Sequence, residues 1–134
     1  MTTIRAANNT LAPPQKALNM ALWTVQALVA LAFLAAGFGK LLGSPAMIAL
    51  FEAIGVGQWF RYVTGSLEVL GAFLLIIPGT VAFGAVVLAC VMAGAIVAHL
   101  MVLHTAPTAP LVLFALTALI AWGRRSQVVN VLGS

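Results

Sequence analysis

The chain has 134 residues, of which 63% are apolar and 6% charged, and its formal net charge is +4. Soluble domains carry about 25% charged residues, so a soluble domain of this composition could not solvate its own surface. The Lys and Arg residues are scattered near the ends of apolar stretches rather than clustered, which argues against nucleic acid as a partner. The composition therefore indicates an integral membrane protein whose first partner is the lipid bilayer.

Four apolar stretches are predicted to cross the membrane, because a hydrocarbon core about 30 Å thick requires roughly 17 to 25 apolar residues per helix. They lie at about 18–40, 60–77, 81–104 and 108–123, and the fourth has the shortest apolar run. The predicted fold is an all-α, four-helix transmembrane bundle over 18–124, after a flexible segment at 1–17 and before a tail at 125–134. A cleavable signal peptide is the competing interpretation of the first stretch, but that stretch is too long and three more follow it.

The connection between the first two stretches holds a further apolar segment at 45–57, which is too short to cross the membrane. Its apolar residues recur at mixed helical spacing, and Glu52 would occupy the polar side. This pattern predicts a short helix lying along the membrane interface. The alternative is a connector with no chemical role.

The distribution of Lys and Arg predicts the orientation, since cytoplasmic flanks carry the excess of these residues. With four spans, one face would hold Arg5, Lys16, Arg124 and Arg125, and the other only Lys40 and Arg61. Both termini are therefore predicted to be cytoplasmic. The tight, uncharged connection at 78–80 should face the cytoplasm as well.

Several kinds of chemistry are not indicated by the sequence. Cys90 is the only cysteine, so the chain by itself cannot perform dithiol–disulfide exchange. There is also no Gly-rich phosphate loop, no HExxH motif and no His/Cys cluster with metal-ligand spacing. The sequence therefore predicts no metal site and no intrinsic cofactor.

Titratable side chains are expected to converge in the outer half of the bundle. Glu68 lies seven residues after Arg61 in the sequence, on the same helical face and about 10 Å deeper. The third stretch runs outward and brings His99 to about one turn below its outer end. The converging residues would be Lys40, Arg61, Glu68, His99 and His104, whereas Gln26 falls in the opposite half.

Two interpretations of this polar cluster are open. A carboxylate at the centre of a membrane helix costs about 2.5–3.5 kcal/mol, so Glu68 needs either a functional or a structural reason to be there. In the functional one, these residues line a polar pocket between the helices in the outer half of the bundle. Glu68 there pairs with a cation or exchanges a proton, His99 titrates, and Arg61 or Lys40 holds an anionic or carbonyl-bearing ligand. In the structural one, the same groups only hold the helices together, and His99 hydrogen-bonds a neighbouring helix. Glu52 and His104 are secondary candidates at the membrane boundary.

Small residues predict where the helices approach one another, since small side chains let membrane helices pack closely. Gly65 and Gly71 flank Glu68 in the second stretch. Others lie at the end of the first stretch and along the third, namely Ala36, Gly37, Gly39, Gly84, Ala89, Ala93, Gly94 and Ala98. The first three stretches are therefore expected to pack around the acid.

These residues also carry a family resemblance. The string Phe33 to Leu41 (FLAAGFGKL) is followed by Arg61-x3-Gly65-x2-Glu68-x2-Gly71, by a turn at Pro78 and by a His near the end of the third stretch. In order and spacing, from about Leu18 to Arg124, the chain resembles the DoxX-like family of small four-helix membrane proteins. The spaced motif from Arg61 to Gly71 is its most specific part.

The resemblance implies a bundle in a bacterial inner membrane and three competing functions. The family name comes from a subunit of a thiosulfate:quinone oxidoreductase, which implies a membrane subunit of a redox assembly that contacts quinone and relies on a partner protein for electrons. Many members have no assigned activity, and a non-catalytic binder or transporter of a small molecule or lipid is the second possibility. Wider relatives include assembly factors and cargo receptors, so an assembly or scaffold protein is the third, and a homo-oligomer is conceivable.

Overall fold

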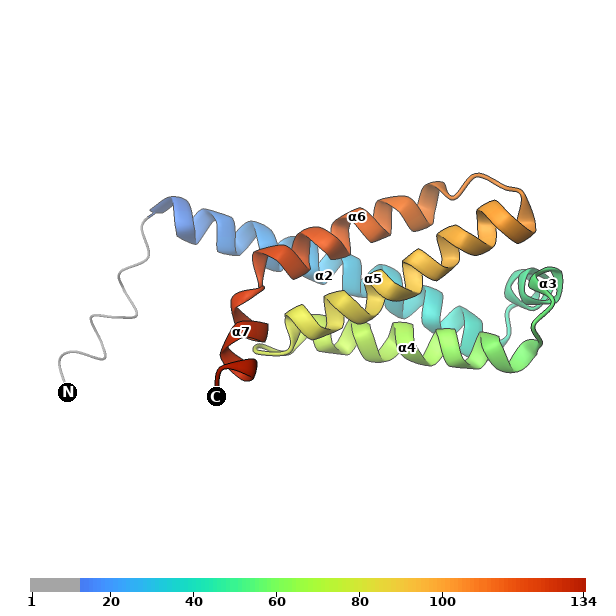
Figure 1. The fold of residues 1–134 in the computed structure, drawn as a ribbon, viewed down its shortest axis with the longest axis horizontal. Helices are drawn as coiled ribbons and strands as arrows, with labels where there is room; N and C mark the ends of the chain where they lie inside the picture. Colours follow the sequence, from blue (N-terminus) through green and yellow to red (C-terminus); the bar gives the residue numbers. More distant parts are fainter. Residues whose placement is uncertain (1–12) are drawn as a thin grey trace.

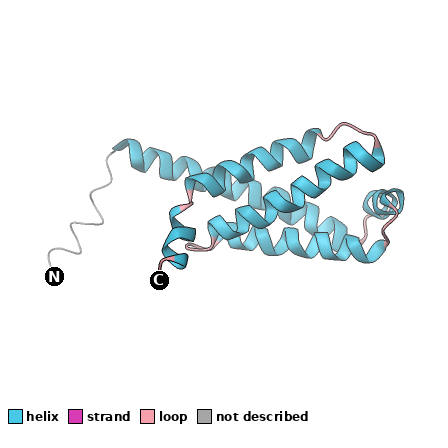
Figure 2. Ribbon diagram, viewed as in Figure 1, coloured by secondary structure: helices cyan, strands magenta, loops and turns pink. Residues whose placement is uncertain are grey.

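The structure, a computed structural model, describes residues 13–134, and every regular element in this part of the chain is a helix (Figures 1 and 2). Arg5 and the rest of 1–12 lie outside the described residues. In chain order the elements are α2 (Pro13–Leu42), α3 (Pro45–Ile54), α4 (Gln58–Ile76), α5 (Val81–Ala98), the π-helical turn η1 (His99–Leu103), α6 (Thr108–Gly123) and α7 (Ser126–Leu132). The predicted all-α class is confirmed.

Three of these helices are long and apolar enough to cross a membrane by length and composition, namely α2, α4, and α5 continued by η1. α6 is also apolar, but its 16 residues give a length of only about 24 Å at 1.5 Å per residue. Several helices that are long and apolar enough to cross a membrane, in one chain, identify a multi-pass membrane protein.

The long helices alternate in direction along the long axis of the molecule (Figure 1). α4 packs against α2 and α5, and α6 packs against α5 and touches α2. The start of α2, the α4–α5 turn and α7 lie at one end, and α3 and the α5–α6 connection lie at the other. Figure 1 shows α3 nearly end on, so its axis crosses those of the long helices.

Helix boundaries follow local chemistry. α2 begins at Pro13, earlier than the predicted position 18, and a proline is tolerated in a first helical turn because its missing N–H would be unpaired there anyway. α3 begins at Pro45 and ends before Gly55, whose φ of 81° is left-handed. The helix at 45–57 is therefore present but stops at Ile54, since a left-handed residue terminates a helix. Within the tail at 125–134, the structure contains the additional helix α7.

Two pairs of glycines let the helices approach closely. A Cβ at Gly37 of α2 would lie 2.9 Å from the Gly65 carbonyl oxygen of α4, and one at Gly84 of α5 would lie 2.8 Å from the Gly71 carbonyl oxygen. The predicted packing of the first three long helices through small residues is confirmed at these four positions. At Gly39 and Gly94, by contrast, an added Cβ would meet nothing within 4 Å.

The bundle places polar side chains inside and many large apolar ones outside. Leu31 and Leu119 are 64% and 55% exposed, as expected of a surface that faces lipid. Buried apolar residues from the four long helices form the core, including Val29, Phe33, Leu75, Leu88, Met92 and Ile120. The buried polar residues of the described chain are Gln26, Arg61, Glu68 and Thr117. This core holds two polar clusters, one toward each end of the bundle.

Candidate functional site

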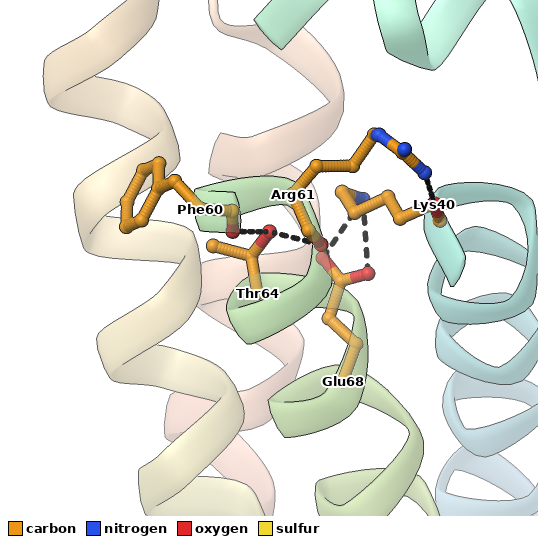
Figure 3. A network of polar contacts seen from close by, with 5 residues as sticks. All are labelled: Lys40, Phe60, Arg61, Thr64 and Glu68. Carbon is orange, nitrogen blue, oxygen red and sulfur yellow. Dashed lines mark hydrogen bonds and ion pairs between the residues drawn. The ribbon is translucent and has the colours of Figure 1, made fainter. Parts of the chain in front are cut away.

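An ion pair between α2 and α4 forms the centre of the first polar cluster. The Lys40 ammonium donates hydrogen bonds to both carboxylate oxygens of Glu68, at 3.1 Å to Oε1 and 2.9 Å to Oε2 (Figure 3). The Glu68 side chain is 2% exposed and that of Lys40 is 14% exposed. Of the two cations expected near Glu68, Arg61 and Lys40, the structure pairs Lys40 with the acid. Because the pair is buried, removing either partner would leave an uncompensated charge inside the bundle and destabilise the fold.

Close packing of the backbone allows the pair to form. Lys40 is three residues beyond Gly37, and Glu68 is three residues beyond Gly65, so each charged residue lies about one helical turn from its glycine. A Cβ at Gly65 would lie 3.0 Å from the Lys40 Cβ. The α2–α4 glycine contact therefore positions the Lys40 side chain over α4, within reach of the acid.

Arg61 lies beside this pair but contacts different groups. Its guanidinium donates through Nη1 to the Lys40 carbonyl oxygen (Figure 3). Through Nε it donates to Gln58 Oε1 at 2.8 Å. It also lies 4.4 Å from the centre of the Tyr62 ring. The last carbonyls of a helix lack intrahelical partners, so Arg61 caps the end of α2 and holds it against the start of α4.

A cavity of about 660 Å³ opens next to the ion pair. Residues from α2, α3, α4, α5, η1 and α6 line it, and nearly all are apolar, with Phe33, Phe51 and Phe60 among them. Lys40, Thr64, Glu68 and His99 are its polar lining residues. A mostly apolar cavity with a few polar groups and a volume of about 300–1,000 Å³ is typical of a small-molecule site.

His99 enters the cavity lining from an irregular part of the chain. It opens the π-helical turn η1, a geometry that often occurs at functional sites. Its Nδ1 lies 2.8 Å from Thr105 Oγ1, and among the described residues its Nε2 has no hydrogen-bond partner. The structure therefore brings His99 into the same cavity as Lys40 and Glu68, without direct contact between them.

The two secondary candidates lie apart from the ion pair. Glu52 is exposed on α3, and His104 is exposed in the α5–α6 connection, where its φ is 51°. Neither residue lines the cavity. Within residues 13–134, no group of three or more His, Cys, Asp and Glu residues could hold a metal ion.

A second polar cluster lies toward the opposite end of the bundle. Buried Gln26 of α2 donates to the Leu75 carbonyl oxygen of α4 at 3.1 Å and accepts from Arg124 Nε at 2.9 Å. Arg124 also donates to Asn19 Oδ1 at 2.8 Å, and its guanidinium lies 5.3 Å from the centre of the Trp23 ring. From the sequence, Gln26 was expected to lie apart from the other polar residues, and Arg124 indicated only the topology. Their predicted placement at the same end was the one available sign of this contact.

Comparison with known proteins bears on the family alone. The sequence model of the DoxX-like family matches residues 24–121, which include the α2–α4 ion pair and all residues that line the cavity. No curated protein and no solved structure shows significant similarity to the chain. The matched region covers most of the chain, from within α2 to near the end of α6. The chain belongs to the DoxX-like family.

Proposed function

We propose that this protein binds a small amphipathic molecule inside the membrane, in the cavity beside Lys40 and Glu68. The observation that carries the proposal is the cavity itself, about 660 Å³ of mostly apolar lining with a buried ion pair at its edge. Apolar walls favour the body of a hydrophobic ligand, and a few polar groups fix its orientation.

The polar groups suit a ligand that carries a carbonyl or hydroxyl group. An ammonium has three N–H donors, and two contacts of Lys40 go to Glu68, which leaves one donor for a ligand oxygen. Thr64 uses its hydroxyl hydrogen within α4, so its oxygen can still accept. His99 adds the unpaired Nε2 as a donor or acceptor.

A quinone is one member of this ligand class, with two carbonyls on an apolar body. If the ligand is a quinone, the protein acts as the membrane subunit of an oxidoreductase assembly, in which a partner protein supplies the electrons and Glu68 or His99 handles protons. If it is a lipid or another apolar metabolite, the protein acts as a binder or transporter without redox chemistry. The cavity supports the ligand class rather than one ligand.

We also propose that α2, α4, α5 and α6 are four membrane spans and that α3 lies at the membrane interface. We infer a bacterial inner membrane from the family, and cytoplasmic termini from the excess of Lys and Arg at the end that holds α7. The short α6 is followed by the exposed Arg125, whose long side chain can extend to the headgroups.

Site-specific labelling tests this placement. In a Cys90→Ala background, Ala106→Cys in the α5–α6 connection should react with a membrane-impermeant maleimide added to intact spheroplasts, because that loop should face outward. Ser134→Cys should react only after the membrane is permeabilised. Labelling of both positions in intact spheroplasts would show that α6 does not cross the membrane.

Ligand binding is tested with two neighbouring substitutions on α5. Gly94 lines the cavity and has open space where a Cβ would lie, whereas Val97 is 58% exposed and does not line it. After mild extraction from the native membrane, mass spectrometry should find a small molecule bound to the wild-type protein. Gly94→Leu should lower its occupancy by about tenfold, the equivalent of about 1.4 kcal/mol, and Val97→Phe should leave it unchanged.

The identity of the retained molecule separates the functional alternatives. A quinone supports the redox-subunit hypothesis, and a lipid or other apolar metabolite supports the binder or transporter. A stoichiometric partner protein without any small molecule would overturn the cavity proposal in favour of an assembly or scaffold protein. Equal retention by wild type and Gly94→Leu would show that the molecule binds elsewhere.

A further inference from the structure

A second hollow, of about 570 Å³, lies between α5 and α6, and Val128 and Val129 of α7 also line it. Small residues of both helices line it, and of its larger apolar residues Val86, Trp122 and Val129 are 48%, 68% and 66% exposed. The small residues are Ala82, Ala89 and Ala93 of α5 and Ala118 and Ala121 of α6. We call this hollow the α5–α6 groove. Its exposed apolar lining would face the acyl chains of the bilayer.

One end of the α5–α6 groove carries a cation. Arg125 lines the groove, its Nη1 donates to the Trp122 carbonyl oxygen at 2.8 Å, and its guanidinium lies 4.5 Å from the centre of the Trp122 ring. α7 continues from it and is tied to the start of α5, because Gln127 Oε1 accepts from the Ala82 N–H at 3.0 Å. The cation therefore sits at the end where the chain leaves α6.

The charge of Arg125 is not neutralised by the chain's own acidic side chains. The sequence has two acidic residues. Glu68 is paired with Lys40, and Glu52 lies on α3, which occupies the other end of the bundle (Figure 1). An anion from outside the protein would complement Arg125 and bind with little competition from the protein.

The length of the α5–α6 groove matches one leaflet. From Ala82 to Ala93 the α5 residues that line it span about 17 Å at 1.5 Å per residue, close to half of a hydrocarbon core about 30 Å thick. We propose that this groove binds one anionic phospholipid, with its phosphate against Arg125 and an acyl chain along the alanines. Basic pockets between membrane helices are known sites for anionic headgroups. The inference rests on the proposed transmembrane placement of α5 and α6.

A second copy of the chain is the competing occupant, because small residues also permit close helix pairing. Two copies related by a twofold axis along the membrane normal would present the same face to each other. Both Arg125 side chains would then face each other at the same depth, with no acidic side chain of the chain between them. Charge complementarity therefore favours the phospholipid.

Native mass spectrometry of the purified protein tests the groove, with phosphatidylglycerol and phosphatidylcholine of identical acyl chains supplied in equal amounts. The wild-type protein should retain one phosphatidylglycerol in preference to phosphatidylcholine. Arg125→Gln should lower that preference by about fivefold, the equivalent of about 1 kcal/mol per cation near the surface. Lys16→Gln removes a charge from the same end but outside the groove, and should leave the preference unchanged.

A second pair of variants tests the apolar part of the groove. Ala118→Phe should fill it and reduce retention of both lipids, whereas Ala115→Phe, on an exposed part of α6 outside the groove, should not. Equal effects of Arg125→Gln and Lys16→Gln would overturn the proposal in favour of general surface charge. A dimer that Ala118→Phe converts to a monomer, without a change in lipid retention, would assign the groove to a second copy.

The tests of the α5–α6 groove can fail or succeed independently of the tests of the cavity ligand. Arg125, Ala115 and Ala118 do not line the cavity beside Glu68, so their variants should retain the cavity ligand. If no cavity ligand is found but the lipid preference depends on Arg125, the proposed function fails and the groove site stands. If α6 proves not to cross the membrane, the labelling of Ala106→Cys and Ser134→Cys will reveal it.

Discussion

Glu68→Gln is expected to destabilise the folded bundle by about 3–5 kcal/mol, because it leaves the mostly buried Lys40 ammonium without its counter-ion. Lys40→Met should cost at least as much, since the carboxylate it strands is the more deeply buried partner. The Lys40→Met/Glu68→Gln double variant should recover a large part of the lost stability, because an unpaired amide costs less to bury than an unpaired charge. Unfolding in detergent, followed by circular dichroism, measures all three.

The double variant also separates the two interpretations of the ion pair. If Lys40 and Glu68 only hold α2 and α4 together, the stable double variant should keep the cavity ligand at wild-type occupancy. If they bind the ligand's polar group, occupancy should fall although the bundle is folded. If the single variants are as stable as the wild type, an unpaired charge at Lys40 or Glu68 does not destabilise the bundle.

Gly37→Ala is expected to cost about 1–3 kcal/mol, the range for overpacking a well-packed interior. The added Cβ would lie 2.7 Å from Val69 Cγ2 and 2.9 Å from the Gly65 carbonyl oxygen. The second of these is a backbone atom, so α2 and α4 must separate to accommodate the methyl group. Thermal unfolding in detergent measures the loss.

Gly39→Ala is the matched control on the same helix, since its Cβ would meet nothing within 4 Å. Both substitutions raise helix propensity by about 1 kcal/mol, so the difference between them isolates the contact. Gly39→Ala should therefore be neutral or stabilising. Similar melting of the two variants would show that α2 and α4 do not approach each other through Gly37.

Much of the fold was predictable because hydropathy and length carry the information. Apolar runs located α4 and α5 to within a few residues, and Pro45 located the start of α3. α7 could not be predicted in the same way, because this seven-residue helix is tied in place by the Gln127 contact to Ala82 on α5. Such a tertiary contact leaves no local pattern in the sequence.

The sequence predicted how deep the polar residues of the candidate site lie along their helices, but not which groups their side chains contact. Helical periodicity placed Lys40, Arg61 and Glu68 near one another. It could not show that Arg61 contacts the end of α2 while Lys40 contacts the acid. Rotamers and the α2–α4 distance decide that choice, and the Gly37–Gly65 contact sets the distance. A pocket in the outer half of the bundle was expected from the convergence of these residues, but the volume and mostly apolar lining of the cavity were not predictable, since they depend on where six elements leave space.

The order of the charged residues along the chain has a consequence for biosynthesis. Lys40 precedes its partner Glu68 by 28 residues, and α2 is complete before α4 is synthesised. A carboxylate alone at a membrane helix centre costs about 2.5–3.5 kcal/mol. Any nascent chain long enough to contain Glu68 already contains Lys40, so the acid enters the bilayer with its counter-ion made and available.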